Sequence, residues 1–193
     1  MIFEVIGEQA IKPLVWETSV AEVIPRAKDV KSFRFPKPEG FRYKAGQWMY
    51  VNIKIGGTQK LHHFTISSSP TENYLEFTKK ITDSIYSQAL DKMKPGDWAK
   101  LNAPFGEFTY SGENIKIGAL TGGIGITPLR SICRYCTDKK LPANIVMLYS
   151  NKTEDEIVFR DELEEMQKAD RNIVIKNVLT REPDWKGLKG HVD

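Results

Sequence analysis

Cysteine is scarce in this sequence, which limits the redox and metal chemistry open to it. The two cysteines, Cys133 and Cys136, lie in PLRSICRYCTDKK, which reads as a helix, and their spacing of three places both side chains on one helix face. No second cysteine pair completes a zinc site, and a disulfide within one helix would constrain little. We therefore expect two buried helix residues rather than a redox pair or half of a metal site, and we expect no metal.

The sequence also lacks long apolar runs and clusters of one charge. No stretch is apolar for long enough to cross a membrane, and the start of the chain holds no basic segment that leads into an apolar run. The 28 lysines and arginines are scattered among 25 acidic residues, which argues against nucleic acid as a partner. We expect a cytoplasmic protein without a membrane span, whose 193 residues suffice for two small domains.

The first half of the chain alternates short β-type runs with turn residues. The runs are LVWETSVAEV, VKSFRF, QWMYVNIKI, HHFTISSS, YLEFTKKI and DWAKLNA. The segments between them include KPEG, GG and KPGD, which are typical of turns. Short strands at this spacing indicate a small closed barrel or a sandwich. One segment, SIYSQALDKM, instead has helical spacing and follows Asp83, a suitable N-cap.

After Tyr110 the pattern changes to strands that alternate with helices. The expected order is the strand IKIGALTGG, a helix from Pro128, the strand IVMLYS, the helix EIVFRDELEEMQK and the strand NIVIKNVLT. Apolar strands that alternate with helices indicate a parallel sheet covered by helices. The boundary between the two patterns is expected near SGEN, residues 111–114.

The segment TGGIGITPLRS is a candidate phosphate-binding turn. Gly122, Gly123 and Gly125 allow the backbone to turn sharply and to approach a ligand. Thr127 is expected to cap the following helix, with Pro128 as its first residue, and the free amides there suit a pyrophosphate. Such a turn can also be a purely structural junction, but the strand before it and the helix after it favour a nucleotide site.

Two further segments are ambiguous when each is considered alone. LHHFTISSSP is consistent with an ordinary strand that has one polar face. TDSIYSQAL is consistent with an ordinary capped helix, although Ser84 and Ser87 lie in its first turn, where free amides can bind phosphate.

Taken in order, five segments resemble the landmarks of the ferredoxin-NADP reductase-like family: AGQWMYVNI, HHFTISS, KPGDWAKLNAPFGEF, TGGIGITPLRSI and LYSNKTEDEIVFRDEL. The resemblance runs from about Trp16 to the end of the sequence. It implies an antiparallel six-stranded β-barrel that binds FAD, residues 1–112, followed by a Rossmann-like α/β domain with a parallel sheet that binds NADPH or NADH, residues 113–193. It also implies that this second domain is incomplete at its C-terminus, since the family's domain continues beyond the matched segments.

The resemblance also implies roles for residues of the barrel. HHFT occupies the place of an Arg-x-Tyr-Ser or Thr motif, so Phe64 is expected to pack on the isoalloxazine, and the catalytic Thr65 is expected to lie near flavin N5. His62 stands where Arg is usual, as in the flavin domains of NADPH oxidases and ferric reductases, and it carries less charge near neutral pH. The implied flavin-binding residues are His62, His63, Phe64, Thr65, Thr78, Lys79, Ile85, Tyr86 and Ser87.

For the nucleotide, the resemblance implies a pyrophosphate loop and a site for the adenosine end. The loop residues are Gly122, Gly123, Ile124, Gly125, Thr127 and Pro128. Thr180 and Arg181 resemble a pair that holds the 2′-phosphate of NADP, and Lys189 is a candidate to assist them.

The function implied is that of an FAD-dependent NAD(P)H oxidoreductase. It would move electrons through flavin N5 between the nicotinamide and an electron carrier, or a haem or iron-sulfur protein. Two alternatives stay open: a non-catalytic module that binds flavin or nucleotide, and an electron-transfer subunit of a larger complex.

Overall fold

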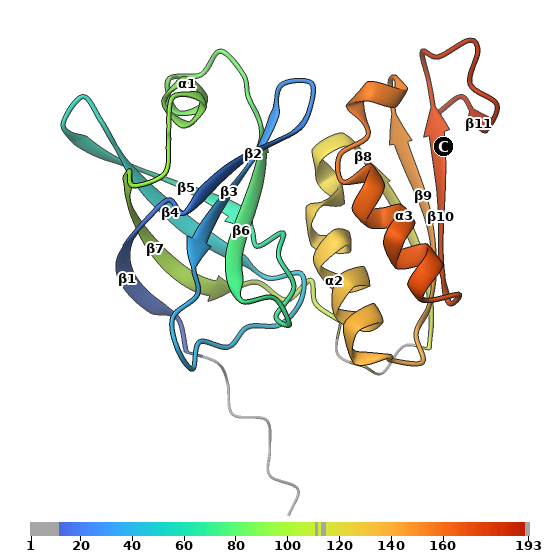
Figure 1. Cartoon of the computed structure of the whole chain (residues 1–193), viewed down its shortest axis with the longest axis horizontal. Coiled ribbons are helices and arrows are strands. Elements are labelled where there is room, and N and C mark those ends of the chain that lie inside the picture. Colours follow the sequence, from blue (N-terminus) through green and yellow to red (C-terminus); the bar gives the residue numbers. More distant parts are fainter. Residues whose placement is uncertain (1–11, 111, 113–114, 192–193) are drawn as a thin grey trace, which may run out of the picture.

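The chain folds into two units that lie side by side (Figure 1). The computed structural model describes residues 12–110, 112 and 115–191. The expected boundary at residues 111–114 falls mostly outside the described residues, as does the chain before Lys12. The division into residues 1–112 and 113–193 therefore stays a prediction.

The first unit is a barrel-like pair of antiparallel sheets closed at one end by a short helix, α1 (Ile85–Asp91) (Figure 1). Its strands are β1 (Leu14–Ser19), β2 (Glu22–Ala27), β3 (Val30–Pro36), β4 (Trp48–Ile55), β5 (Thr58–Thr65), β6 (Tyr74–Lys80) and β7 (Trp98–Phe105). One sheet has the order β1-β7-β4-β5 and the other the order β2-β3-β6. Apolar side chains from both sheets, among them Phe33, Met49, Phe77 and Leu101, form a single core.

Over residues 12–110 the barrel-like unit has seven strands where six were expected. The run at residues 14–23, predicted as one strand, divides at Val20 and Ala21, where the chain passes from one sheet to the other. The Val20 N–H donates to the Asp97 carbonyl at 2.9 Å and the Ala21 N–H donates to the Arg34 carbonyl at 2.8 Å. Val20 itself is 1% exposed, so it fills the corner between the sheets.

The cap of α1 also differs from the prediction. Ser84, and not Asp83, is the N-cap, because its backbone is extended and its hydroxyl accepts the N–H of Ser87 at 3.2 Å. Asp83 is exposed one residue before the cap.

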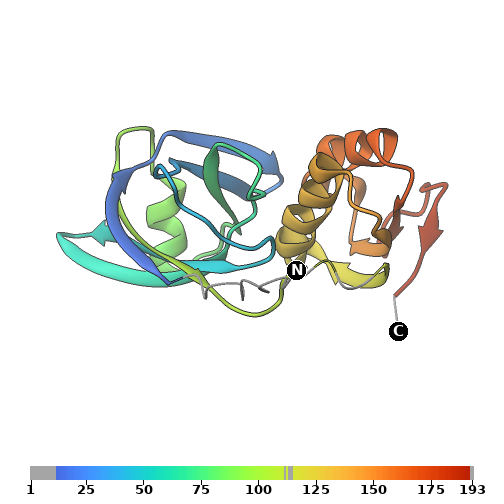
Figure 2. The ribbon, with the colours of Figure 1, turned by 90° about the horizontal axis from the view of Figure 1, so that it is seen from below.

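The second unit is the expected parallel sheet, covered on one face by two helices (Figures 1 and 2). Its strands are β8 (Lys116–Gly122), β9 (Asn144–Asn151), β10 (Ile173–Leu179) and β11 (Leu188–Lys189), in the order β11-β10-β9-β8. The helices are α2 (Ile126–Lys139) and α3 (Arg160–Ala169). Cys133 and Cys136 are fully buried in α2, as predicted, and burial raises the pKa of the Cys133 thiol to about 12. Among the described residues, no helix combines the length and apolarity needed to cross a membrane.

The helix predicted at residues 156–168 begins later, at Arg160. A 3₁₀ turn, η2 (Glu154–Glu156), precedes it, and the segment Ile157–Phe159 is buried in the core in non-helical conformation. Burial of these three apolar side chains in the core is favoured over a longer helix that would include them.

The two units are joined by a buried arginine of α2. Arg130 is 1% exposed, and its guanidinium contacts both carboxylate oxygens of Glu72, one of them at 3.0 Å. It also donates to the Ser67 carbonyl at 3.1 Å and to Glu162 of α3 at 2.9 Å. Because Ser67 and Glu72 lie in the β5–β6 connection of the barrel, one side chain ties α2 and α3 to the first unit.

A second arginine extends this ion network into the barrel. Arg26 of β2 donates to Glu162 at 2.5 Å and to the fully buried Glu76 at 2.8 Å. The guanidinium carbons of Arg26 and Arg130 lie 5.0 Å and 5.5 Å from the centre of the Phe159 ring. The Arg26–Glu162 pair thereby adds a second ionic contact between the units.

We predict that Arg130→Met lowers the free energy of unfolding by about 3 kcal/mol, since removing one partner of a buried ion pair leaves the other charge uncompensated. Urea unfolding measures this. Arg134→Met is the control one helical turn later, because Arg134 is 37% exposed and pairs only with Asp138 of its own helix among the described residues. That change should cost less than about 0.5 kcal/mol. Equal losses in the two variants would contradict the assignment of Arg130 as the tie between the units.

The same network predicts a pH dependence. Burial alone would raise the pKa of Glu72, but the hydrogen bonds and charge of Arg130 outweigh it and hold that pKa below its ordinary value. A carboxyl group with a lowered folded pKa stabilises the fold above its unfolded pKa of about 4.3, and this stabilisation is lost as the pH falls through the folded pKa. Glu72→Gln should therefore flatten the loss of stability below about pH 4.3, measured by urea unfolding, whereas exposed Glu39→Gln should keep the slope of the unchanged chain.

Candidate functional site

A cleft of about 620 Å³ lies between the barrel and the start of α2. Its lining residues come from β4, β5, β6, the turn after β8 and the first turn of α2. They are Trp48, Tyr50, His63, Phe64, Thr65, Thr78, Lys79, Ile124 and Thr127. All but Trp48 and Tyr50 belong to the set predicted from the sequence, so folding brings the barrel motif and the glycine-rich turn to one place.

The end of β5 supplies the centre of the cleft wall. The half-buried ring of Phe64 stacks on the buried Phe77, with centroids 4.5 Å apart and planes 15° from parallel, which fixes its orientation. Thr65 follows at the last position of the strand, opposite Trp48. Within the described part of the chain its hydroxyl has no hydrogen-bond partner, so that hydroxyl is available to a ligand.

Trp48 and Tyr50 are cleft residues that the sequence analysis missed. The Trp48 ring stacks on Phe105 at 4.8 Å and lies 4.9 Å from Tyr50 and 5.4 Å from His63. A glycine is needed beside it, because a Cβ on Gly106, whose φ is +93°, would lie 2.6 Å from the indole. The alternation of residues along β4 could have revealed them. The β4 positions between these two aromatics and after them are buried, so Trp48 and Tyr50 lie on the outer face.

Thr78 and Lys79 reach the cleft in different ways. The Thr78 hydroxyl is engaged behind the wall, 2.7 Å from the Ser32 hydroxyl and 3.0 Å from that of Ser67. The Lys79 ammonium donates to the carbonyl of Lys80 at 2.6 Å, and burial lowers its pKa. Lys80 does not line the cleft, because successive side chains of a strand point to opposite faces.

The residues predicted near α1 lie outside the cleft. The His62 ring packs on Tyr86 at 4.1 Å, and Ile85 is 76% exposed. Tyr86 is buried, with its hydroxyl donating to the Val51 carbonyl at 2.8 Å. Ser87 is also fully buried, and its hydroxyl accepts from Thr82 at 3.1 Å. Ser87 only accepts in this hydrogen bond and its own O–H donates to no described residue, so its role as a phosphate-binding residue stays a prediction.

The helix after the glycine-rich turn begins at a different residue from the one predicted. A 3₁₀ turn, η1 (Gly123–Gly125), separates β8 from α2, and Gly125 is the N-cap. Thr127 is thus inside the helix, where its hydroxyl donates to the Ile124 carbonyl at 3.2 Å, and Pro128 is the third helical residue and not the first. The extra turn moves the helix start towards the sheet and leaves Gly122 and Gly125 exposed.

A second pocket, of about 400 Å³, lies at the carboxyl ends of β8, β9 and β10, the usual ligand position in parallel sheets. Its lining residues are Lys80, Gly123, Ser150, Asn151, Lys152, Glu156, Thr180, Arg181 and His191. The predicted Thr180 and Arg181 are held there, because their amides donate to the carbonyls of Asn151 and Lys152 at 3.0 Å and 2.8 Å. Lys189, the candidate assistant, instead donates to the Pro183 carbonyl at 2.5 Å.

Asn151 is a pocket residue that no sequence pattern pointed to. It is 5% exposed, and neither its amide oxygen nor its amide nitrogen has a hydrogen-bond partner within the described residues. A buried amide without a partner is unfavourable, so its presence favours a polar ligand at this point.

Two family models match the chain. The model of an oxidoreductase FAD-binding domain matches residues 18–110, and that of an oxidoreductase NAD-binding domain matches residues 120–193. The chain belongs to the ferredoxin-NADP reductase-like family. Both cofactor domains implied by the sequence are therefore present, in the expected order, with the cleft formed where they meet.

Individual members of this family are similar along most of the chain. A ferredoxin-NADP reductase B from Sorangium cellulosum is 27% identical over 92% of this chain and 75% of its own length. An NADH-cytochrome b5 reductase 2 from Gallus gallus is 32% identical over 85% of this chain and 65% of its own length. The chain spans 50% of a glycine betaine monooxygenase reductase subunit from Pseudomonas aeruginosa, at 29% identity.

The fold also has solved counterparts. The structure of a ferredoxin NADP+ reductase from Neisseria gonorrhoeae, with bound FAD and NADP, superposes with a TM-score of 0.81 at 22% identity. The match covers 92% of this chain and 73% of that one, so the arrangement of both units is that of the family.

We predict that Trp48→Ala weakens FAD binding roughly tenfold, because it removes an aromatic wall from the cleft. An equilibrium titration that follows the flavin fluorescence measures this. Trp98→Ala is the matched control, since Trp98 lies on β7 outside the cleft, where its indole donates to Glu17 at 3.0 Å. If both variants bind FAD equally well, the cleft does not hold the flavin ring.

Proposed function

We propose that the chain acts as an FAD-dependent NAD(P)H oxidoreductase that passes electrons between a nicotinamide dinucleotide and an electron carrier. The observation that carries the proposal is the cleft in which Phe64 and Thr65 of the barrel meet Thr127 at the start of α2. One cleft that touches both domains allows two cofactors to approach each other.

The cleft suits a planar flavin. Aromatic rings of Trp48, Tyr50 and Phe64 offer flat apolar surface, and the Thr65 hydroxyl and Lys79 ammonium offer polar contacts at its edge. When bound, FAD supplies the hydride-accepting chemistry at N5. The side chains are proposed to hold the ring, to orient it through the Thr65 hydroxyl, and to keep water away from it.

The second pocket suits the dinucleotide. The α2 helix has 14 residues, and its N-terminal amides carry the positive end of the helix dipole, which favours a pyrophosphate. Asn151 offers a buried amide, and Lys152 and Arg181 are exposed cations at the pocket. Because a 2′-phosphate would be held by such cations, NADPH is the first dinucleotide to test, before NADH.

The electron carrier is proposed to be a haem or iron-sulfur protein, since relatives are named as reductases of ferredoxin and cytochrome b5. We also propose a cytoplasmic location. A subunit of a larger electron-transfer complex and a non-catalytic module are the second candidates. The His62 substitution favours the module, because an imidazole lacks the two-pronged donor of the usual arginine.

Anaerobic mixing of the FAD-loaded chain with NADPH or NADH tests the proposal, with loss of the visible flavin absorbance as the signal. Thr65→Val should slow this loss about a hundredfold, because it removes one preorganised hydrogen bond at the reacting edge, and should leave the FAD affinity within about twofold. Thr58→Val, an exposed change at the other end of β5, should have no effect. A chain that binds FAD but is reduced by neither dinucleotide would contradict the proposal.

A further inference from the structure

A buried tyrosine hydroxyl attaches the glycine-rich turn to the core. Tyr149 of β9 is 0% exposed, and its hydroxyl donates to the Gly123 carbonyl at 3.0 Å. The same hydroxyl accepts the N–H of Val158, in the segment before α3, at 3.2 Å. Because a backbone N–H can only donate, the single proton of the hydroxyl is directed to Gly123.

The ring that carries this hydroxyl is held by the sheet. Tyr149 lies on β9, between β8 and β10, with Thr121 and Asn177 as its partners on those strands. It belongs to the core that α2 and α3 cover. Burial raises the pKa of Tyr149 to about 12, so the hydroxyl keeps its proton at neutral pH. The position of the hydroxyl and its proton are therefore both set by the fold before any ligand binds.

Gly123 is a residue whose orientation depends on such a hydrogen bond. Its φ is +50°, in the left-handed region that glycine adopts at little cost, and a Cβ added there would meet no atom of a neighbouring segment within 4 Å. Packing therefore does not fix this residue. Its carbonyl is held instead by two donors, the Tyr149 hydroxyl and the N–H of Ile126.

The direction of the Gly123 carbonyl decides the direction of the next amide. The peptide unit between Gly123 and Ile124 is planar and trans, so the Ile124 N–H points away from Tyr149. Ile124 is the second residue of η1, in the first turn, where N–H groups have no acceptor inside the helix. Gly123 lines the nucleotide pocket and Ile124 lines the cleft. This amide thus lies at the border of the two cavities, between the proposed places of the nicotinamide and the adenosine.

We propose that Tyr149 is a positioning residue for the dinucleotide, because its hydroxyl orients the Ile124 N–H towards the pyrophosphate. This role rests on the proposed dinucleotide site. Tyr149 touches no ligand itself, since it is fully buried. An amide that already points outwards binds a phosphate oxygen without the entropic cost of ordering the turn at that moment.

Tyr149→Phe tests this role, since it removes the hydroxyl and keeps the ring. Calorimetric titration of the FAD-loaded chain with ADP-ribose should show about fivefold weaker binding in this variant, the effect of one neutral hydrogen bond. The FAD affinity should stay within about twofold, because the barrel side of the cleft is unchanged.

Amide NMR adds a measurement that a merely structural role of Tyr149 would not change. Without ADP-ribose, the Ile124 signal of Tyr149→Phe should broaden through exchange between two orientations of the peptide, whereas the same signal of the unchanged chain should stay sharp. Saturating ADP-ribose should sharpen the signal of the variant, because the bound pyrophosphate selects one orientation.

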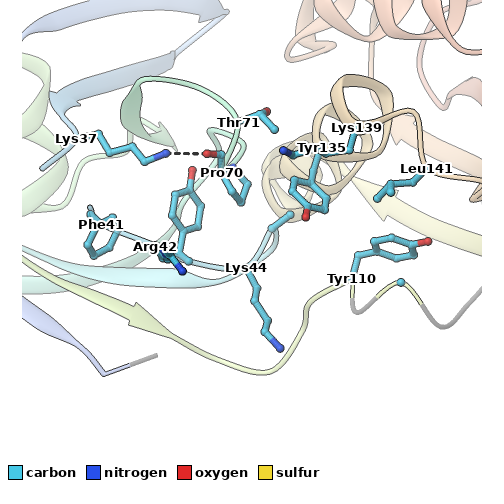
Figure 3. A pocket seen from close by; sticks show the side chains of 13 residues that line it. Lys37, Phe41, Arg42, Lys44, Pro70, Thr71, Tyr110, Tyr135, Lys139 and Leu141 are labelled. Carbon is cyan, nitrogen blue, oxygen red and sulfur yellow. Dashed lines mark hydrogen bonds between the residues drawn. The ribbon is translucent and has the colours of Figure 1, made fainter. Parts of the chain in front are cut away.

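Tyr43→Phe is the matched control. Tyr43 is also buried, and its hydroxyl donates to the Ser68 carbonyl at 3.0 Å. It lines a cavity of about 680 Å³ in which Lys37 donates to the Pro70 carbonyl at 2.7 Å (Figure 3). None of the described residues that line this cavity lines the nucleotide pocket. Tyr43→Phe should therefore lose a buried hydrogen bond but keep the ADP-ribose affinity and the sharp Ile124 signal.

Three results would overturn the role of Tyr149. The first is equal binding of ADP-ribose by Tyr149→Phe and the unchanged chain. The second is an Ile124 signal that is equally sharp in both. The third is an equal loss of affinity in Tyr43→Phe, which would make the effect one of general stability. If the unchanged chain itself binds no ADP-ribose, the proposed dinucleotide site is wrong, and this role is wrong with it.

Discussion

The pairing of Arg130 with Glu72 and Glu162 is the contact on which the geometry of the site depends. Arg130 lies three positions after Thr127, and its partner Ser67 lies two positions after Thr65, so the pairing fixes the two sides of the cleft relative to each other. Buried ion pairs contribute little net stability compared with apolar packing, but a wrongly paired arrangement is costly. The network therefore selects one relative position of the two units, which is what alignment of two cofactors requires.

Two neighbouring lysines of β6 place one positive charge at the cleft and one at the nucleotide pocket. Lys79 and Lys80 are neighbours in β6, yet one lines the cleft and the other lines the pocket beside Gly123. Since successive side chains of a strand point to opposite faces, a single pair of lysines serves two sites. The aromatic rings are concentrated in the cleft, and the polar groups at the strand ends are concentrated in the pocket, as the chemistry of a flavin ring and of a phosphorylated nucleotide requires.

Local patterns predicted the elements well and their junctions poorly. The strands around Phe77 and the parallel strands β8 to β10 follow from apolar periodicity, because that pattern reports burial directly. The break at Val20, the cap at Ser84 and the 3₁₀ turn before α2 did not follow, because each is decided by hydrogen bonds to segments or neighbours whose geometry the pattern does not specify. The outward face of Trp48 was readable in principle from its buried neighbours in β4.

The sequence by itself determined the family, the order of the two domains and most residues of the cleft, because these depend on ordered motifs and on the periodicity of apolar side chains. Only the tertiary structure decided which side chains are free to act. Thr78 belongs to the predicted set, but its hydroxyl is engaged by those of Ser32 and Ser67, whereas Asn151 reaches its pocket with both amide atoms unpaired among the described residues. Availability of a polar group depends on all its neighbours in space, and those neighbours are brought together by contacts between segments far apart in the chain.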